Sequence, residues 1–214
     1  MLSALSLFVI IANTESLSVT LNEFNHVSIK GPITNLTASS FISDIENIKT
    51  KHIYIYIDST GGSVLDGEKI IQYIQFKKNN KHTILCIASH AYSMAFHIFQ
   101  HCSTRFVIPT SVLMQHQMSL TISGQLKNIK NYISMIDSIN TKYIEYESKK
   151  LGLTTADFNN KIETDWWMYS NDIIKNNAAD LMLESVGCDK SLFKNNFKLD
   201  VDSVIYTVSD CPLV

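Results

Sequence analysis

The chain has 214 residues, of which 45% are hydrophobic and 18% are charged, and its formal net charge is −2. This length and composition fit one globular domain with a hydrophobic core, or one domain with an appended element. The balanced charge provides no broad basic field, so we expect no nucleic-acid partner. These values exclude neither an enzyme nor a binding module.

The N-terminal segment, residues 1–23, contains an uncharged apolar run from Leu2 to Ala12. The run has the length of the apolar part of a secretory signal and is too short to span a bilayer. No Lys or Arg precedes it, which speaks against export. Two interpretations stay open: a signal peptide, and an apolar segment that packs on a partner subunit.

Further along the chain, extended and helical patterns alternate. Residues 53–57 alternate isoleucine with tyrosine, the period-two pattern of a strand, and a turn cluster with two glycines follows. Helical spacing at 65–76 precedes an apolar strand at 82–89 and a turn into a helix at 91–102. Residues 104–116 suggest two short extended pieces broken at Pro109. This alternation predicts an α/β fold built from βαβ units.

Residues 125–150 follow the three-and-four spacing of one long amphipathic helix. Its predicted inner face consists of Leu126, Ile129, Ile133, Ile136, Ile139, Tyr143, Ile144 and Glu147. This face is too apolar to stand in water alone, so the helix should pack on the body of the protein or on a second subunit. Gly152 is a stop signal, and Thr154 opens a further short helix with the pattern of a capping box.

The four cysteines show neither a CxxC pair nor a regular framework. Cys86 lies inside an apolar run, and we expect it to be a buried free thiol. Cys188 and Cys211 could pair in an oxidising compartment, and the spacing alone leaves this open.

Ser93 stands between a strand-and-turn pattern and the start of a helix, where nucleophiles are often presented. Free N–H groups at a helix N-terminus favour an oxyanion. A serine in this position is usually only a helix cap, so a catalytic role requires a histidine base and an acid that orients it.

Partners for Ser93 occur further along the chain. His116 ends an extended run and is the best candidate for the base, although it could be a structural histidine. Asp165 precedes two tryptophans and could orient that base, or it could be a solvated carboxylate. Gly61 and Gly62 follow a strand, where two glycines allow a backbone to approach a ligand closely.

In this order, these motifs resemble a known family. Residues 24–183 resemble ClpP, the proteolytic subunit of the Clp proteases, within the ClpP/crotonase fold. The motifs that carry the resemblance are "IYIYIDSTGGSVLDG", "ASHAYSMAF", "VLMQHQM" and "IETDWWMYS". The resemblance implies an α/β fold of repeated ββα units with a protruding long handle helix at 125–150. It also implies a peptidase domain at 24–187, followed by a C-terminal extension at 188–214.

Carried over by position, the resemblance implies a serine endopeptidase that needs no cofactor. Ser93 would be the nucleophile, His116 the general base and acid, and Asp165 the residue that orients His116. The N–H groups of Gly62 and Met94 would form the oxyanion hole, and an extended polypeptide substrate would lie beside Gly61 and Gly62.

The family also implies a homo-oligomer of two stacked heptameric rings, an AAA+ unfoldase partner, and the cytoplasm or an organelle matrix as the location. The run 2–12 leaves export open. Residues 1–23 do not resemble the family's axial loops, and Thr164 stands where the family usually has an arginine. The unfoldase is therefore implied by the family alone.

Other functions fit the sequence less well. His97 and His101 have the spacing of a metal-binding helical face, but Ile98 stands where a glutamate is expected and no third ligand is evident. We therefore expect no metal site, and two histidines packed near the cleft. A crotonase-type enzyme would use carboxylates as acid and base, and signal-peptide-peptidase-A-like proteases use a Ser–Lys dyad. A catalytically silent ring scaffold is the remaining alternative.

Overall fold

The computed structural model describes residues 17–194, 197–201 and 204–213. The apolar run 2–12 lies outside these residues, so neither interpretation of that run is tested. Within the described part of the chain, no helix is both long enough and apolar enough to cross a membrane.

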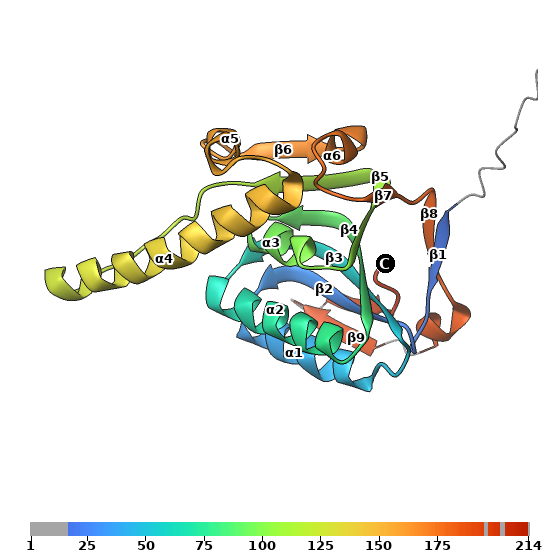
Figure 1. Cartoon of the computed structure of the whole chain (residues 1–214). Helices are drawn as coiled ribbons and strands as arrows, with labels where there is room; N and C mark the ends of the chain where they lie inside the picture. The colour runs from blue at the N-terminus through green and yellow to red at the C-terminus, as the bar shows by residue number, and fades with distance from the viewer. Residues whose placement is uncertain (1–16, 195–196, 202–203, 214) are drawn as a thin grey trace, which may run out of the picture.

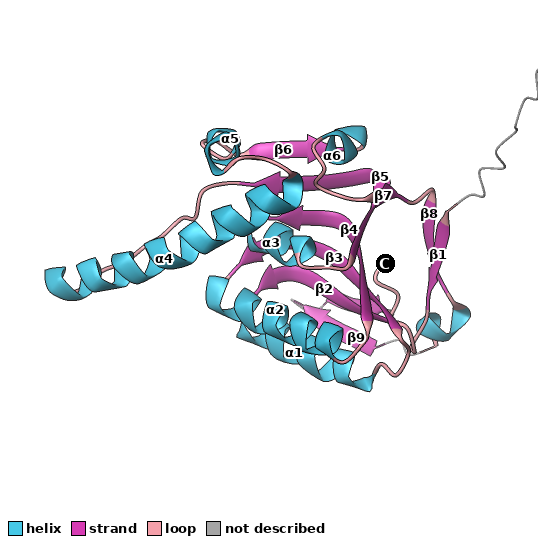
Figure 2. Cartoon of the chain, in the orientation of Figure 1, coloured by secondary structure: helices cyan, strands magenta, loops and turns pink. Residues whose placement is uncertain are grey.

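A six-stranded sheet forms the centre of the described structure (Figures 1 and 2). The strands β2 (His26–Ile33), β3 (His52–Gly62), β4 (Thr83–Tyr92) and β5 (Thr104–Gln115) run parallel in that order. The strand β6 (Trp166–Tyr169) adds antiparallel to β5, and the short β7 (Leu181–Met182) pairs parallel with β5. The predicted α/β architecture is therefore confirmed.

Helices cover one face of this sheet. They are α1 (Asn35–Asn47), α2 (Val64–Asn79), α3 (Met94–Gln100), α5 (Thr155–Lys161) and α6 (Asn171–Lys175). The isoleucines of β3 at 53, 55 and 57 point into the main core with Phe41, Phe96 and Phe158. Because this set is apolar and fully buried, it holds the helices against the strands whose C-terminal ends carry the site.

The opposite face of the sheet carries a smaller apolar cluster. Tyr54 and Tyr56 alternate with the isoleucines of β3, so they point to this second face, where they meet Ile87 and Phe106. This second face of the sheet is covered by segments from the two ends of the described chain. These segments include β1 (Ser18–Leu21) with β8 (Ser185–Cys188), the 3₁₀ turn Lys190–Phe193, and Cys211, while β9 (Phe197–Val201) and β10 (Val204–Val208) form a hairpin of their own.

The long helix α4 (Leu126–Leu151) projects from the body, as Figure 1 shows, and confirms the predicted helix at 125–150. It ends at Gly152, whose φ of 73° is the left-handed conformation that favours glycine. Only Glu147, Ser148 and Leu151 on this helix are buried, all at its C-terminal end. Its N-terminal half leaves apolar side chains in solvent, with Leu126 69% exposed.

Two predicted boundaries need correction. The strand β3 continues through Gly61 and Gly62 instead of ending in a turn, because both glycines pair with the end of β2. The two pieces expected at 104–116 form a single strand, β5, whose register against β4 shifts around Pro109. Proline lacks the N–H that a continuous ladder would use, so the strand accommodates it as an irregularity.

The expectation of a free thiol at Cys86 was wrong. Cys86 is fully buried as expected, but it forms a disulfide with Cys102, because β4 and the end of α3 bring the two Cα atoms within 5.9 Å. Cys188 and Cys211, whose pairing the sequence left open, form a second disulfide. Among the described residues no cysteine is free.

Candidate active site

Ser93 lies at the sharp turn between β4 and α3. Its backbone has a φ of 54°, a left-handed conformation that is rare for a residue with a side chain. The turn is held because the Ser93 N–H donates to the Met114 carbonyl at 2.9 Å and the His97 N–H donates to the Ser93 carbonyl at 3.1 Å. The Ser93 hydroxyl makes no capping hydrogen bond to the helix, so the ordinary cap function does not account for this serine.

The Gly61–Gly62 pair lies against this turn. A Cβ atom at Gly61 would meet the Tyr92 carbonyl oxygen at 2.5 Å and the Ser93 Cβ at 2.9 Å, and the φ of Gly61 is 83°. Only glycine fits both this conformation and this close approach. The main chain at the end of β3 therefore lies directly beside Ser93 and Met94.

His116 follows the last residue of β5 and faces Ser93. Its Nε2 atom lies 2.8 Å from the Ser93 hydroxyl oxygen, within ordinary hydrogen-bond distance, and its ring is partly buried. The serine is on the turn after β4 and the histidine on the end of the neighbouring β5, so the parallel pairing of these strands brings the two side chains together.

Asp165 does not join this pair in the structure. Its side chain is exposed and makes no hydrogen bond to His116. Its main chain is nevertheless near, because β5 and β6 pair antiparallel with Gln115 opposite Trp166. His116 follows Gln115 and Asp165 precedes Trp166, so both residues adjoin the last pair of this ladder.

A pocket opens beside the Ser93–His116 pair. Its walls come from the start of α2, the start of α3, the end of β5, α4 and α5. The lining residues are Val64, Ser93, Met94, His97, Gln115, His116, Met118, Asn140, Tyr143, Ile144, Glu147, Phe158 and Ile162. The lining combines apolar side chains with an equal share of polar ones, and the polar ones include Ser93 and His116. Apolar surface with converging polar groups is a common character of substrate pockets.

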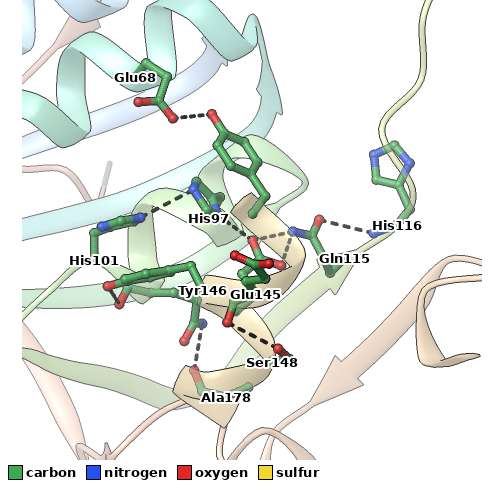
Figure 3. Close-up of polar contacts among 12 residues, drawn as sticks. Glu68, His97, His101, Gln115, His116, Glu145, Tyr146, Ser148 and Ala178 are labelled. Atoms are coloured by element: carbon green, nitrogen blue, oxygen red, sulfur yellow. Dashed lines mark hydrogen bonds and ion pairs between the residues drawn. The ribbon is translucent and has the colours of Figure 1, made fainter. Parts of the chain in front are cut away.

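One wall of this pocket is formed by a buried polar network (Figure 3). Glu147 on α4 accepts hydrogen bonds from His97 at 2.6 Å and from Gln115 at 2.7 and 2.8 Å. Gln115 lies between this network and His116, whose main-chain N–H donates to the Gln115 side-chain oxygen at 3.1 Å. Sequence reasoning placed Glu147 on an apolar helix face without assigning it a role. The signal that could have indicated its role was the presence of one carboxylate in an otherwise apolar helix face.

His101 extends the network away from the site. Its Nε2 lies 3.3 Å from that of His97, and its ring stacks on Tyr146 with a centroid distance of 3.9 Å. Burial, helped by the nearby positive charges of Lys78 and Lys150, lowers the pKa of His101 to about 3 and keeps the ring neutral. His97 and His101 thus pack against aromatic rings of α4, and no group of three potential metal ligands occurs in the described part of the chain.

Comparison with known proteins matches this chain to a protein family and to curated relatives. The family model of the Clp protease matches residues 12–184 of this chain. The ATP-dependent Clp protease proteolytic subunit of Borrelia garinii subspecies bavariensis is 29% identical over 162 residues, which cover 73% of this chain and 83% of that protein. The family match spans the sheet, the Ser93–His116 pair and the projecting helix. This chain belongs to the Clp protease family and is a ClpP-like peptidase.

Proposed function

We propose that this chain is a serine-type endopeptidase in which Ser93 and His116 carry out acyl-enzyme chemistry on polypeptides. The observation that carries the proposal is the 2.8 Å distance between the Ser93 hydroxyl and His116 Nε2, at a strand-to-helix turn with a positive φ. A serine hydroxyl is a weak nucleophile unless a base within hydrogen-bond reach removes its proton. His116 is such a base.

In the proposed mechanism, His116 takes the Ser93 proton as the hydroxyl oxygen attacks a peptide carbonyl. His116 then protonates the leaving amine, and water repeats the sequence to release the acid and free the serine. The tetrahedral oxyanion would be bound by the N–H groups of Gly62 and Met94. The close approach of Gly61 to Ser93 and Met94 supports this assignment, because it brings the two segments together at the nucleophile.

Asp165 is proposed as the residue that orients His116. Support for this role comes from the β5–β6 ladder, whose last pair is Gln115 and Trp166, because His116 follows Gln115 and Asp165 precedes Trp166. We propose that the assembled oligomer holds Asp165 in contact with His116.

The substrate would lie extended beside Gly61 and Gly62 and bind mainly through its main chain, with one side chain in the pocket next to Ser93. Specificity for side chains should therefore be broad. By family membership, the assembly would be two stacked heptameric rings with the projecting α4 as the handle between them. An AAA+ unfoldase would deliver unfolded chains to the inner chamber.

A specific observation favours a second candidate function, a catalytically silent ring scaffold. The Asp165 carboxylate is exposed and does not contact His116 in the single chain. If the carboxylate stays away from His116 in the oligomer as well, the ring would lack one member of the triad.

The experiment that tests the proposal is hydrolysis of casein and of short fluorogenic peptides by the purified oligomer. We expect Ser93→Ala and His116→Ala to abolish turnover of both substrates. Ser89→Ala, on β4 four residues before Ser93, is the matched control and should retain turnover. A folded wild type without turnover of either substrate favours the scaffold.

A further inference from the structure

One carboxylate on α4 contacts the elements that carry both members of the proposed catalytic pair. Glu147 is only 1% exposed, and its two partners, His97 and Gln115, are 2% and 7% exposed. His97 Nδ1 donates to one carboxylate oxygen at 2.6 Å, and Gln115 Nε2 lies within 2.8 Å of both oxygens. The three side chains come from α4, α3 and β5, three elements that are separate in sequence.

Each partner is one step away from a reacting residue. Gln115 precedes His116, and its Oε1 atom accepts the main-chain N–H of His116 at 3.1 Å, as Figure 3 shows. His97 lies one helical turn after Ser93, and its main-chain N–H donates to the Ser93 carbonyl at 3.1 Å. Glu147 therefore bonds to the side chains of two residues that each make a hydrogen bond to the main chain of His116 or Ser93. None of these bonds involves the Ser93 hydroxyl or the His116 ring.

The hydrogen bonds of Glu147 restrict the positions of Gln115 and His97. A buried carboxylate without partners costs several kcal/mol, so movement of Gln115 or His97 away from Glu147 is strongly disfavoured. Hydrogen bonds also have preferred directions, whereas an apolar side chain of the same size would fill the space without fixing an orientation. The His97 ring also stacks on Tyr143, with ring centroids 3.7 Å apart, so a second residue of α4 restrains His97.

We propose that Glu147 is a positioning residue which, through Gln115 and His97, aligns His116 with Ser93. The alignment of the pair then depends on the C-terminal end of the projecting helix α4. This inference rests on the proposed serine-peptidase function and adds to it a link between the helix and the site.

The test measures the rate at which a fluorophosphonate probe labels Ser93 in the intact oligomer, together with kcat and KM for a fluorogenic peptide. Gln115→Leu keeps the size of the side chain and removes its hydrogen bonds. We expect a fall in labelling rate and kcat of about 10- to 100-fold, because a displacement of about 1 Å has effects of this size on catalysis.

Gln100→Leu is the matched control. Gln100 is also a fully buried glutamine, and its side chain bonds to the Ala178 carbonyl at 3.1 Å and to Arg105 at 2.5 Å. It makes no hydrogen bond to Gln115 or His116, so its loss should lower thermal stability and leave the labelling rate close to that of the wild type.

Exchanging the glutamine at 115 and the glutamate at 147 distinguishes a positioning role from general destabilisation. In Gln115→Glu, two buried carboxylates face each other, and the labelling rate should fall as in Gln115→Leu. In the double variant Gln115→Glu/Glu147→Gln, the carboxylate at 115 accepts hydrogen bonds from the His116 N–H and from the side-chain NH₂ at 147. The side-chain oxygen at 147 accepts the hydrogen bond from His97. We expect the double variant to regain most of the wild-type rate.

The outcomes distinguish the two claims. If the wild type is not labelled at Ser93, the proposed function fails and the inference fails with it. If the wild type is labelled and Gln115→Leu is labelled at the same rate, only the inference is overturned. If Gln115→Leu does not fold, the exchange decides, because a folded double variant as slow as Gln115→Glu also overturns the inference.

Discussion

At the scale of single residues, Asp165 decides whether the catalytic group is a pair or a triad. Asp165→Asn removes the carboxylate that would orient His116 and stabilise its charged form. If the triad forms in the oligomer, we expect the rate of Ser93 labelling to fall by about 100-fold or more. The comparison variant is Glu163→Gln, an exposed acidic residue two positions earlier, which should behave like the wild type. Equal rates for Asp165→Asn and the wild type would show that the pair works without Asp165.

The lowered pKa of His101 makes the free energy of unfolding depend on pH. Its pKa is lowered to about 3 in the folded protein by burial, and by the charges of His97, Lys78 and Lys150 when these are protonated. The unfolded chain binds a proton near pH 6.5, so the stability that comes from keeping His101 neutral is complete above that pH and is lost as the pH falls toward 3. The loss approaches about 1.4 kcal/mol per pH unit for one group.

Urea unfolding over this pH range measures the effect. The variant His101→Gln should give a flatter dependence of the unfolding free energy on pH than the wild type does. Parallel curves for the two proteins would contradict the role of His101.

At the scale of elements, the N-terminal half of α4 leaves apolar side chains in water that a second copy of the chain could bury. Ile133 is 39% exposed on the face that includes Leu126. Ile133→Asp places a charge in this proposed interface, where it would cost several kcal/mol if left unpaired. Sedimentation should therefore detect a smaller particle with unchanged helix content, while Ser134→Asp on the neighbouring face keeps the wild-type mass. An unchanged mass for Ile133→Asp would exclude this face from the assembly.

The Cys188–Cys211 disulfide fastens the C-terminal segment across the second face of the sheet. It joins two positions 23 residues apart, and Cys211 packs with Tyr56, Ile87 and Phe106. Replacing both cysteines by alanine should lower the unfolding free energy by about 3 kcal/mol, the usual effect for a loop of this length. It should also increase binding of a dye that reports exposed apolar surface. Free thiols in the denatured, unreduced wild type would contradict the pairing.

At the scale of the whole molecule, local patterns predicted the alternating α/β fold, whereas the pairing of Ser93 with His116 was implied by the resemblance to the ClpP family. Strand periodicity and the order of motifs specify which elements are neighbours, and the two residues lie at the ends of adjacent parallel strands. The Cys86–Cys102 pair was missed because it depends on how α3 turns back onto β4, which spacing does not reveal. The roles of Gln115 and Glu147 were missed because a polar residue facing a core has a visible purpose only once its partners are placed.

The central claim is that Ser93 is an activated nucleophile, and the most direct measurement is site mapping of a fluorophosphonate adduct by mass spectrometry. The intact oligomer is labelled, digested and compared with Ser93→Ala and His116→Ala. We expect a single adduct on the peptide that contains Ser93, absent in Ser93→Ala and strongly reduced in His116→Ala. A folded wild-type oligomer with no adduct at Ser93, or with an adduct unaffected by His116→Ala, would contradict the account.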